Sequence, residues 1–193
     1  MSFDKDMSHT NWENVRKKQT ETLSLAQKWI QITGMTSGSI VMDIGPGAGV
    51  LTAEYAKAVG KEGKVYAVEE SSGALEYMRK QTVGDLPQVE LVNMDAQAGL
   101  PQVDNLHSIL ITGVLHHTDS PLAVLRHVRE VANPRTQVLI SEFDPEEKGE
   151  FGMPLEHRIS RQQLIQWSSQ AGLQLMDSQS TDYEQYWLLL RAI

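Results

Sequence analysis

The strongest constraint on the fold is an apolar segment that runs into a glycine-rich loop and then into a helical pattern. The segment covers residues 40–44, the loop holds Gly45, Gly47 and Gly49, and the pattern predicts a helix over 49–59. Glycines at such positions permit positive φ angles and let a ligand approach the backbone closely. The N–H groups and the positive dipole end of the helix can receive a carboxylate or a phosphate. The unit therefore predicts a ligand site at the carboxyl end of a parallel strand.

The spacing of the glycines narrows the ligand class. A dinucleotide fingerprint reads G-x-G-x-x-G, whereas this chain has its third glycine, Gly49, one place early. A glycine turn with only a structural purpose is the alternative at this point. Asp43, at the end of the strand before the loop, favours a ligand-binding loop over a purely structural turn.

Three acids follow the same rule of position. Asp43, Glu69 and Asp95 lie at the ends of three successive predicted strands, over 40–44, 64–69 and 89–93. Because the carboxyl ends of parallel strands share one edge of a sheet, these acids are expected to converge. Glu69 lies 20 residues beyond Gly49, and a carboxylate there can accept both hydroxyls of a ribose.

The rest of the chain alternates between strand and helix patterns, which predicts an α/β fold with a mostly parallel sheet covered on both faces. Residues 1–10 are expected to form a mobile arm, and residues 144–154 an exposed loop that either covers the site or only connects two elements. Helices are predicted over 11–33, 73–81, 121–132 and 161–171, and further strands over 108–112, 137–142, 173–177 and 186–192.

Two motifs resemble those of the class I S-adenosylmethionine-dependent methyltransferases. The stretch from Asp43 to Gly49 is similar to motif I of that family, and the stretch from Thr112 to His117 to motif IV. The Leu-His-His ending resembles the methyltransferase type 11 group, which includes the quinone C-methyltransferases. The resemblance implies a Rossmann-like, doubly wound, mostly parallel seven-stranded sheet with helices on both faces and a C-terminal antiparallel strand pair. We expect one domain over 1–193, with a helical cap over 1–33 and the core over 34–193.

The resemblance also implies cofactor contacts, residue by residue. Motif I would hold the methionine part of the cofactor, Glu69 its ribose, Asp95 with Ala96 its adenine, and Thr112 would lie near the transferable methyl group. Two positions depart from the family pattern: Glu70 stands where an apolar residue usually packs on the adenine, and His107 where an Asp is common. The cofactor contacts expected are Asp43, Gly45, Pro46, Gly47, Glu69, Glu70, Asp95, Ala96 and Thr112.

The function implied is transfer of a methyl group from S-adenosylmethionine to a small-molecule acceptor by in-line displacement, with S-adenosylhomocysteine as product. Candidates for a catalytic base are His116, Glu142 and His157, with His117 less favoured, since histidine titrates near neutral pH. A nicotinamide-dependent (NAD) oxidoreductase shares the glycine loop and the ribose acid, and is one alternative. A non-catalytic nucleoside-binding module on the same fold is the other.

Composition limits the partners. The chain has 17 basic and 25 acidic residues, a formal charge of −8, so a nucleic acid would be repelled on average. Cysteine is absent, which excludes thiolate metal sites, and the histidine spacing matches no metal-ligand pattern. The sequence shows no run of apolar residues long enough to cross a membrane. A cytoplasmic enzyme without a metal is expected, and the oligomeric state stays open.

Overall fold

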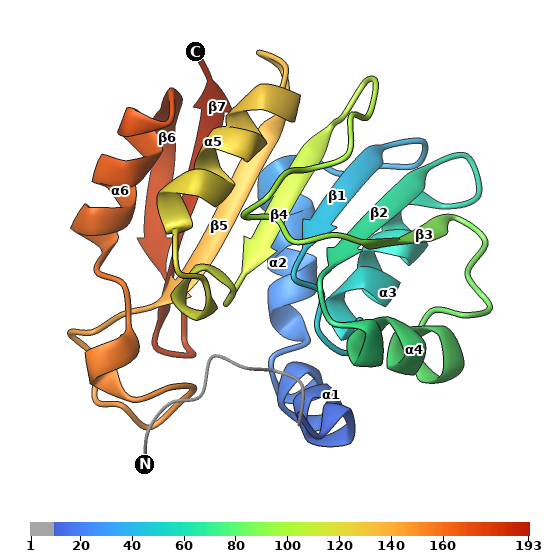
Figure 1. Ribbon diagram of the computed structural model, residues 1–193, viewed down its shortest axis with the longest axis horizontal. Helices are drawn as coiled ribbons and strands as arrows, with labels where there is room; N and C mark the ends of the chain where they lie inside the picture. The colour runs from blue at the N-terminus through green and yellow to red at the C-terminus, as the bar shows by residue number, and fades with distance from the viewer. Residues whose placement is uncertain (1–9) are drawn as a thin grey trace.

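Seven strands form one sheet in the computed structural model, which describes residues 10–193 (Figure 1). Their order is β3-β2-β1-β4-β5-β7-β6; the first five run parallel, and β7 is antiparallel to both β5 and β6. The arm expected over residues 1–10 lies outside the described residues, except for Thr10. The strands are β1 (Ile40–Ile44), β2 (Lys64–Glu69), β3 (Val89–Asn93), β4 (Ser108–Thr112), β5 (Gln137–Phe143), β6 (Leu173–Ser180) and β7 (Gln185–Ala192).

Alternating side chains of the central strands divide the core into two layers. In β4, Ile109 and Ile111 pack with α5 on one face, whereas Leu110 packs with α2 and α3 on the other. This period of two is what a strand covered on both faces requires. The helices are α1 (Trp12–Glu21), α2 (Ser24–Thr33), α3 (Val50–Val59), α4 (Ser72–Gln81), α5 (Pro121–Val131) and α6 (Arg161–Gln170), with short 3₁₀ turns η1 (Leu115–His117) and η2 (Leu155–His157).

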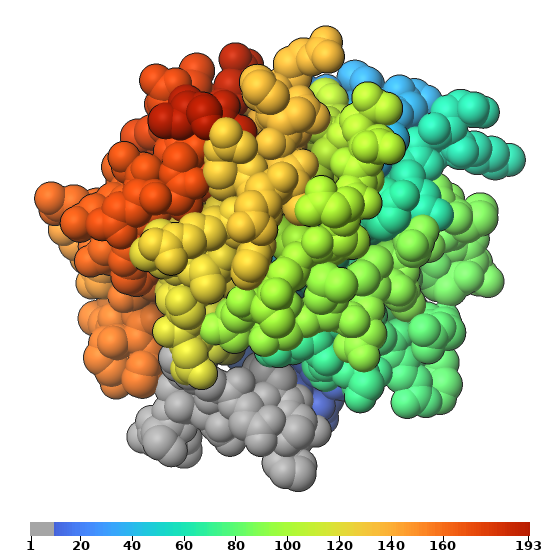
Figure 2. All heavy atoms as spheres, turned by 45° about the horizontal axis from the view of Figure 1, so that its top comes forward, coloured from blue at the N-terminus to red at the C-terminus, as the bar shows by residue number. Residues whose placement is uncertain are grey.

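The crossover from β3 to β4 contains no helix. Its segment, residues 94–107, instead packs Met94, Leu100 and Leu106 against the core layer that holds α5. Figure 2 shows this segment and α5 side by side over one face of the molecule. The arrangement leaves the turn directly after β3 at the edge of the sheet, where a ligand can reach it.

The N-terminal region differs from the single helix expected over residues 11–33. The structure has two helices, α1 and α2, with a break at Thr22 and Leu23. No residue of α1 is buried, whereas α2 buries Leu25, Ala26 and Trp29 against the sheet. The apolar residues of α1, Trp12 and Val15, lie in its first half, so no apolar stripe marks where the helix ends and the pattern did not reveal the break.

The other elements agree with the predicted ranges to within three residues at each end. Two serines cap helices: Ser71 accepts a backbone N–H at the start of α4, and Ser160 accepts one at the start of α6. His107 bonds through Nε2 to the Thr33 carbonyl at 3.1 Å and so links β4 to the end of α2. Within residues 10–193, no helix is both long and apolar enough to span a bilayer, and no three His, Asp or Glu side chains gather as metal ligands would.

Candidate active site

A cleft opens at the carboxyl ends of β1, β2, β3 and β4, and Trp12, Val15 and Gln19 of α1 line one side of it. Most of the predicted cofactor residues line it, whereas Asp43 and Pro46 do not. The lining consists of Trp12, Val15, Gln19, Ile44, Gly45, Gly47, Val68, Glu69, Glu70, Met94, Asp95, Ala96, Gln97, Thr112, Gly113, Val114, His117 and Thr118.

The glycine loop forms the floor of the cleft. Gly45 has a φ of +67°, and a Cβ there would lie 2.5 Å from Cγ2 of Val114. Only glycine allows both this backbone conformation and this approach of the η1 turn to the loop. The loop thereby brings the end of β1 and the motif IV segment into direct contact.

Glu69 reaches across the loop from the end of β2. Its Oε2 accepts the Gly47 N–H at 3.3 Å and its Oε1 accepts the Ser71 N–H at 2.9 Å. Burial raises the pKa of Glu69 above its ordinary value, and the hydrogen bonds from Ser71 and Gly47 act in the opposite direction. Each oxygen accepts one N–H and keeps a further lone pair. The carboxylate is therefore held rigidly and can still take both hydroxyls of a diol.

The turn after β3 supplies a further part of the lining. Asp95 accepts the Gln97 N–H at 2.8 Å, and the Gln97 side chain accepts the N–H groups of Asp119 and Ser120, each at 2.9 Å. Glu70 is exposed at the rim; partial burial, then the charge of Asp95, raises its pKa. Gln97 thus ties this part of the lining to the start of α5, a role that no sequence signal indicated.

Gln19 fastens α1 to the glycine loop. Its Nε2 donates to the Pro46 carbonyl at 2.9 Å, and its Oε1 accepts the Val50 N–H at 3.4 Å. The sequence did not indicate this residue, because a glutamine among the polar residues of a helix gives the same pattern as a side chain that contacts only solvent. With Trp12 and Val15, it closes one side of the cleft.

Asp43 lies beneath the floor of the cleft. It is 4% exposed and accepts the Thr52 hydroxyl at 2.6 Å, which joins β1 to the first turn of α3. Burial raises the pKa of Asp43 to about 7; the Thr52 bond acts against this shift, and the charge of Glu69 adds to it. The predicted contact of Asp43 with the cofactor stays a prediction.

This shift makes folding stability depend on pH. Between pH 4 and 7 the unfolded state has lost the Asp43 proton that the folded state keeps, so the free energy of unfolding falls as pH rises. Asp43→Asn removes this contribution. We expect the free energy of unfolding of the variant to rise relative to that of the wild type as pH increases across this window, by up to about 1.4 kcal/mol per pH unit. Urea denaturation at pH 4.5, 5.5 and 6.5 measures it, and parallel curves would contradict it.

The structure brings two of the three predicted catalytic residues together, behind the wall of the cleft. Glu142 ends the buried part of β5 and accepts His116 Nδ1 at 2.6 Å, with both side chains at most 4% exposed. Its Oε1 also accepts the N–H groups of Val114 at 3.1 Å and Leu115 at 2.7 Å. Because the buried Glu142 carboxylate accepts three hydrogen bonds, it is suited to hold the η1 turn in place.

The other two candidate histidines, His117 and His157, lie in different places. His117 lines the cleft, with its ring centre 4.2 Å from that of His116. His157 ends η2 on the 144–158 loop and is not part of the lining. Sequence reasoning ranked His116 above His117, because a pattern does not show which way neighbouring residues of a 3₁₀ turn point.

Comparisons with known proteins agree with this geometry. Residues 41–135 match the model of the family described as "Methyltransferase domain". The ubiquinone/menaquinone biosynthesis C-methyltransferase UbiE of Teredinibacter turnerae is 34% identical over 118 residues, which are 59% of this chain and 47% of that protein. UbiE of Escherichia coli O1:K1 / APEC is 32% identical over the same length, 46% of that protein. The chain thus spans about half the length of these curated relatives.

Solved structures show the same fold over a larger part of the chain. A SAM-dependent methyltransferase from Aquifex aeolicus superimposes with a TM-score of 0.86 at 23% identity, over 100% of both chains. The [4+2]-cyclase SpnF gives 0.76 at 17% identity, over 90% of this chain and 82% of its own. The predicted fold class is confirmed. The chain therefore shares the fold of these solved structures, a methyltransferase from Aquifex aeolicus among them, and its residues 41–135 match the methyltransferase domain family.

Proposed function

We propose that the protein transfers a methyl group from S-adenosylmethionine to a small-molecule acceptor. The observation that carries the proposal is the convergence of Glu69 and Asp95 on one cleft, above a glycine loop that admits a ligand. The residues fit this cofactor, because Glu69 offers two preoriented oxygens for a ribose diol. The Gln97 N–H, which holds the Asp95 carboxylate in place, would keep it ready for the adenine.

The chain's own residues would position the reaction. When bound, the cofactor supplies an electrophilic sulfonium methyl group, so no covalent enzyme intermediate is needed. Glu69 would accept the ribose hydroxyls, and Asp95 the exocyclic amine of the adenine. The α1 wall would exclude water and hold the acceptor in line. His117, on the cleft wall, would take a proton from the acceptor, with His116 and Glu142 fixing its turn; a role for His157 stays a prediction.

The charge of the cleft favours an uncharged or cationic acceptor. The described residues that line the cleft include no Lys or Arg, but they include three acidic residues, Glu69, Glu70 and Asp95. An anionic acceptor or a nucleic acid would meet repulsion. The names of the UbiE relatives concern a C-methyltransferase of quinone biosynthesis, which favours a carbon atom of a quinone-like molecule. The cytoplasmic location stays a prediction.

The test is transfer of label from methyl-labelled S-adenosylmethionine to a panel of neutral quinols, phenols and amines. Each neutral compound is paired with a carboxylated analogue. We expect label in at least one neutral or cationic acceptor, at least tenfold above its carboxylated partner. At a cofactor concentration below saturation, we expect at least tenfold less label with a Glu69→Ala variant. Faster labelling of the carboxylated partners would contradict the proposed acceptor class. A wild-type protein that binds NADH but not S-adenosylmethionine would contradict methyl transfer itself.

A further inference from the structure

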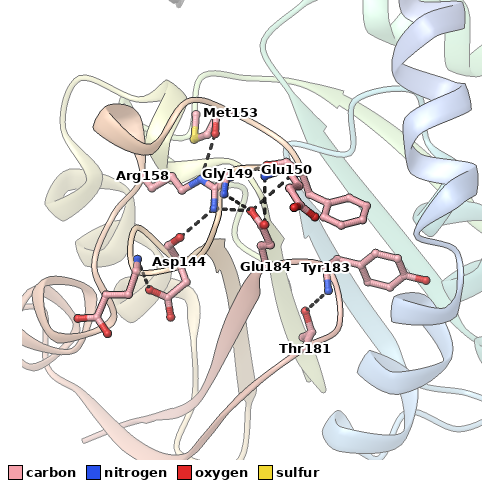
Figure 3. Close-up of polar contacts among 10 residues, drawn as sticks. Asp144, Gly149, Glu150, Met153, Arg158, Thr181, Tyr183 and Glu184 are labelled. Atoms are coloured by element: carbon pink, nitrogen blue, oxygen red, sulfur yellow. Dashed lines mark hydrogen bonds and ion pairs between the residues drawn. The ribbon is translucent and has the colours of Figure 1, made fainter.

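A buried ion pair outside the cleft joins the last hairpin to the loop over residues 144–158 (Figure 3). Glu184, directly before β7, is 7% exposed and adopts a left-handed φ of 54°. Its carboxylate accepts three successive N–H groups of residues 149–151, at 3.0, 3.1 and 3.4 Å. It also accepts Arg158 Nη1 at 2.9 Å. One side chain thus holds three loop amides and a guanidinium in fixed positions.

Arg158 is committed to the same loop. Its side chain is fully buried, and it donates to the carbonyls of Met153 at 3.0 Å, Asp144 at 2.9 Å and Phe151. Figure 3 shows the bonds from Arg158 to Asp144, at the start of the loop, and to Met153, further along it. Because these donors are occupied inside the protein, the arginine fixes the shape of the loop and is not placed to bind an anionic ligand.

Phe143 connects the loop to the catalytic candidates. The guanidinium of Arg158 lies 5.4 Å from the centre of its ring. Gly152 packs so closely on the ring that a Cβ there would lie 2.4 Å from it. Phe143 also meets the His116 ring edge-on, with the two centres 6.0 Å apart. The loop, Phe143 and His116 therefore form one continuous packed path.

The path ends at the wall of the cleft. His116 is bonded to Glu142, which accepts the N–H groups of Val114 and Leu115, and Val114 lines the cleft. We infer that Arg158 and Glu184 are positioning residues: through Phe143 they hold the His116 ring against Glu142 and so fix the wall that faces the methyl acceptor. This role rests on the proposed function, whereas the packing path itself does not.

The test uses Glu184→Gln in the full-length protein. The amide keeps one acceptor oxygen but turns an NH₂ group toward donors, so the loop loses its anchor. We expect amide hydrogen exchange of residues 149–151 to rise at least tenfold. We also expect the NMR signal of the His116 Nδ1 proton, protected in the wild type by its bond to Glu142, to broaden or disappear. Affinity for S-adenosylhomocysteine should stay within twofold, since the cofactor residues are untouched.

Two further variants make the result decisive. Glu147→Gln removes an exposed charge from the same loop and should leave both signals unchanged. Phe143→Leu keeps the ion pair but removes the ring contact, and should alter the His116 signal without freeing the amides of 149–151. A His116 signal unchanged in both Glu184→Gln and Phe143→Leu would overturn the inference, as would unchanged exchange in Glu184→Gln. A wild type that does not bind S-adenosylhomocysteine would instead overturn the proposed function, because the NMR signals need no ligand.

Discussion

Glu69→Ala is expected to lower the affinity for S-adenosylhomocysteine by about 100-fold. The ribose would lose two hydrogen bonds to a carboxylate; at about 1.5 kcal/mol each, the low end of the range for charged groups, this loss corresponds to roughly 100-fold. The variant also leaves the N–H groups of Gly47 and Ser71 without their acceptor, so the floor of the cleft loosens. Calorimetric titration of the purified variant and of the wild type measures the difference.

Glu90→Ala is the matched control. Glu90 lies near the amino end of β3, is exposed, and pairs with Lys64 at 3.0 Å. Its replacement makes the same change of charge in the same sheet, far from the carboxyl edge, and should change the affinity less than twofold. A folded Glu69→Ala protein with wild-type affinity would remove Glu69 from the site.

Glu142→Ala is expected to lower the free energy of unfolding by about 4 kcal/mol, with a fall in Tm of about 10 °C. The side chain is fully buried, and its loss leaves three donors without an acceptor: the N–H groups of Val114 and Leu115, and His116 Nδ1. Each buried donor left unmet costs about 1–3 kcal/mol. Urea denaturation followed by circular dichroism gives the value.

Two further variants serve as comparisons for this stability measurement. Glu142→Gln keeps one oxygen as an acceptor and should lose less than the alanine variant. Glu62→Ala, at an exposed turn, should stay within about 0.5 kcal/mol of the wild type. A loss below 1 kcal/mol in Glu142→Ala would show that water or a shift of the η1 turn satisfies these donors.

Local patterns were sufficient to predict most of the fold. The strand, glycine loop and helix at residues 40–59 carry strong signals, because apolar periodicity and glycine requirements act between near neighbours. Helix caps such as Ser71 and Ser160 are local for the same reason. The break between α1 and α2 was missed, since α1 buries no residue and has no apolar residue after Val15 to mark where it ends.

The site was predictable only where strand ends define it. Glu69 and Asp95 follow from topology, because parallel strands bring their carboxyl ends to one edge. Gln19 and Glu184 act over sequence separations of 27 and 35 residues on the loops they hold. No local pattern encodes such partners. Which of the two histidines faces the cleft likewise depends on how η1 packs on Glu142: His117 lines the cleft, whereas His116 bonds to Glu142.

The most direct test of the account is calorimetric titration of the wild type with S-adenosylhomocysteine, S-adenosylmethionine and NADH. The cleft, lined by both Glu69 and Asp95, predicts saturable 1:1 binding of the first two and none of the third. Binding of NADH alone would mean that the glycine loop serves a nicotinamide cofactor. That result would contradict the proposal that this protein transfers methyl groups.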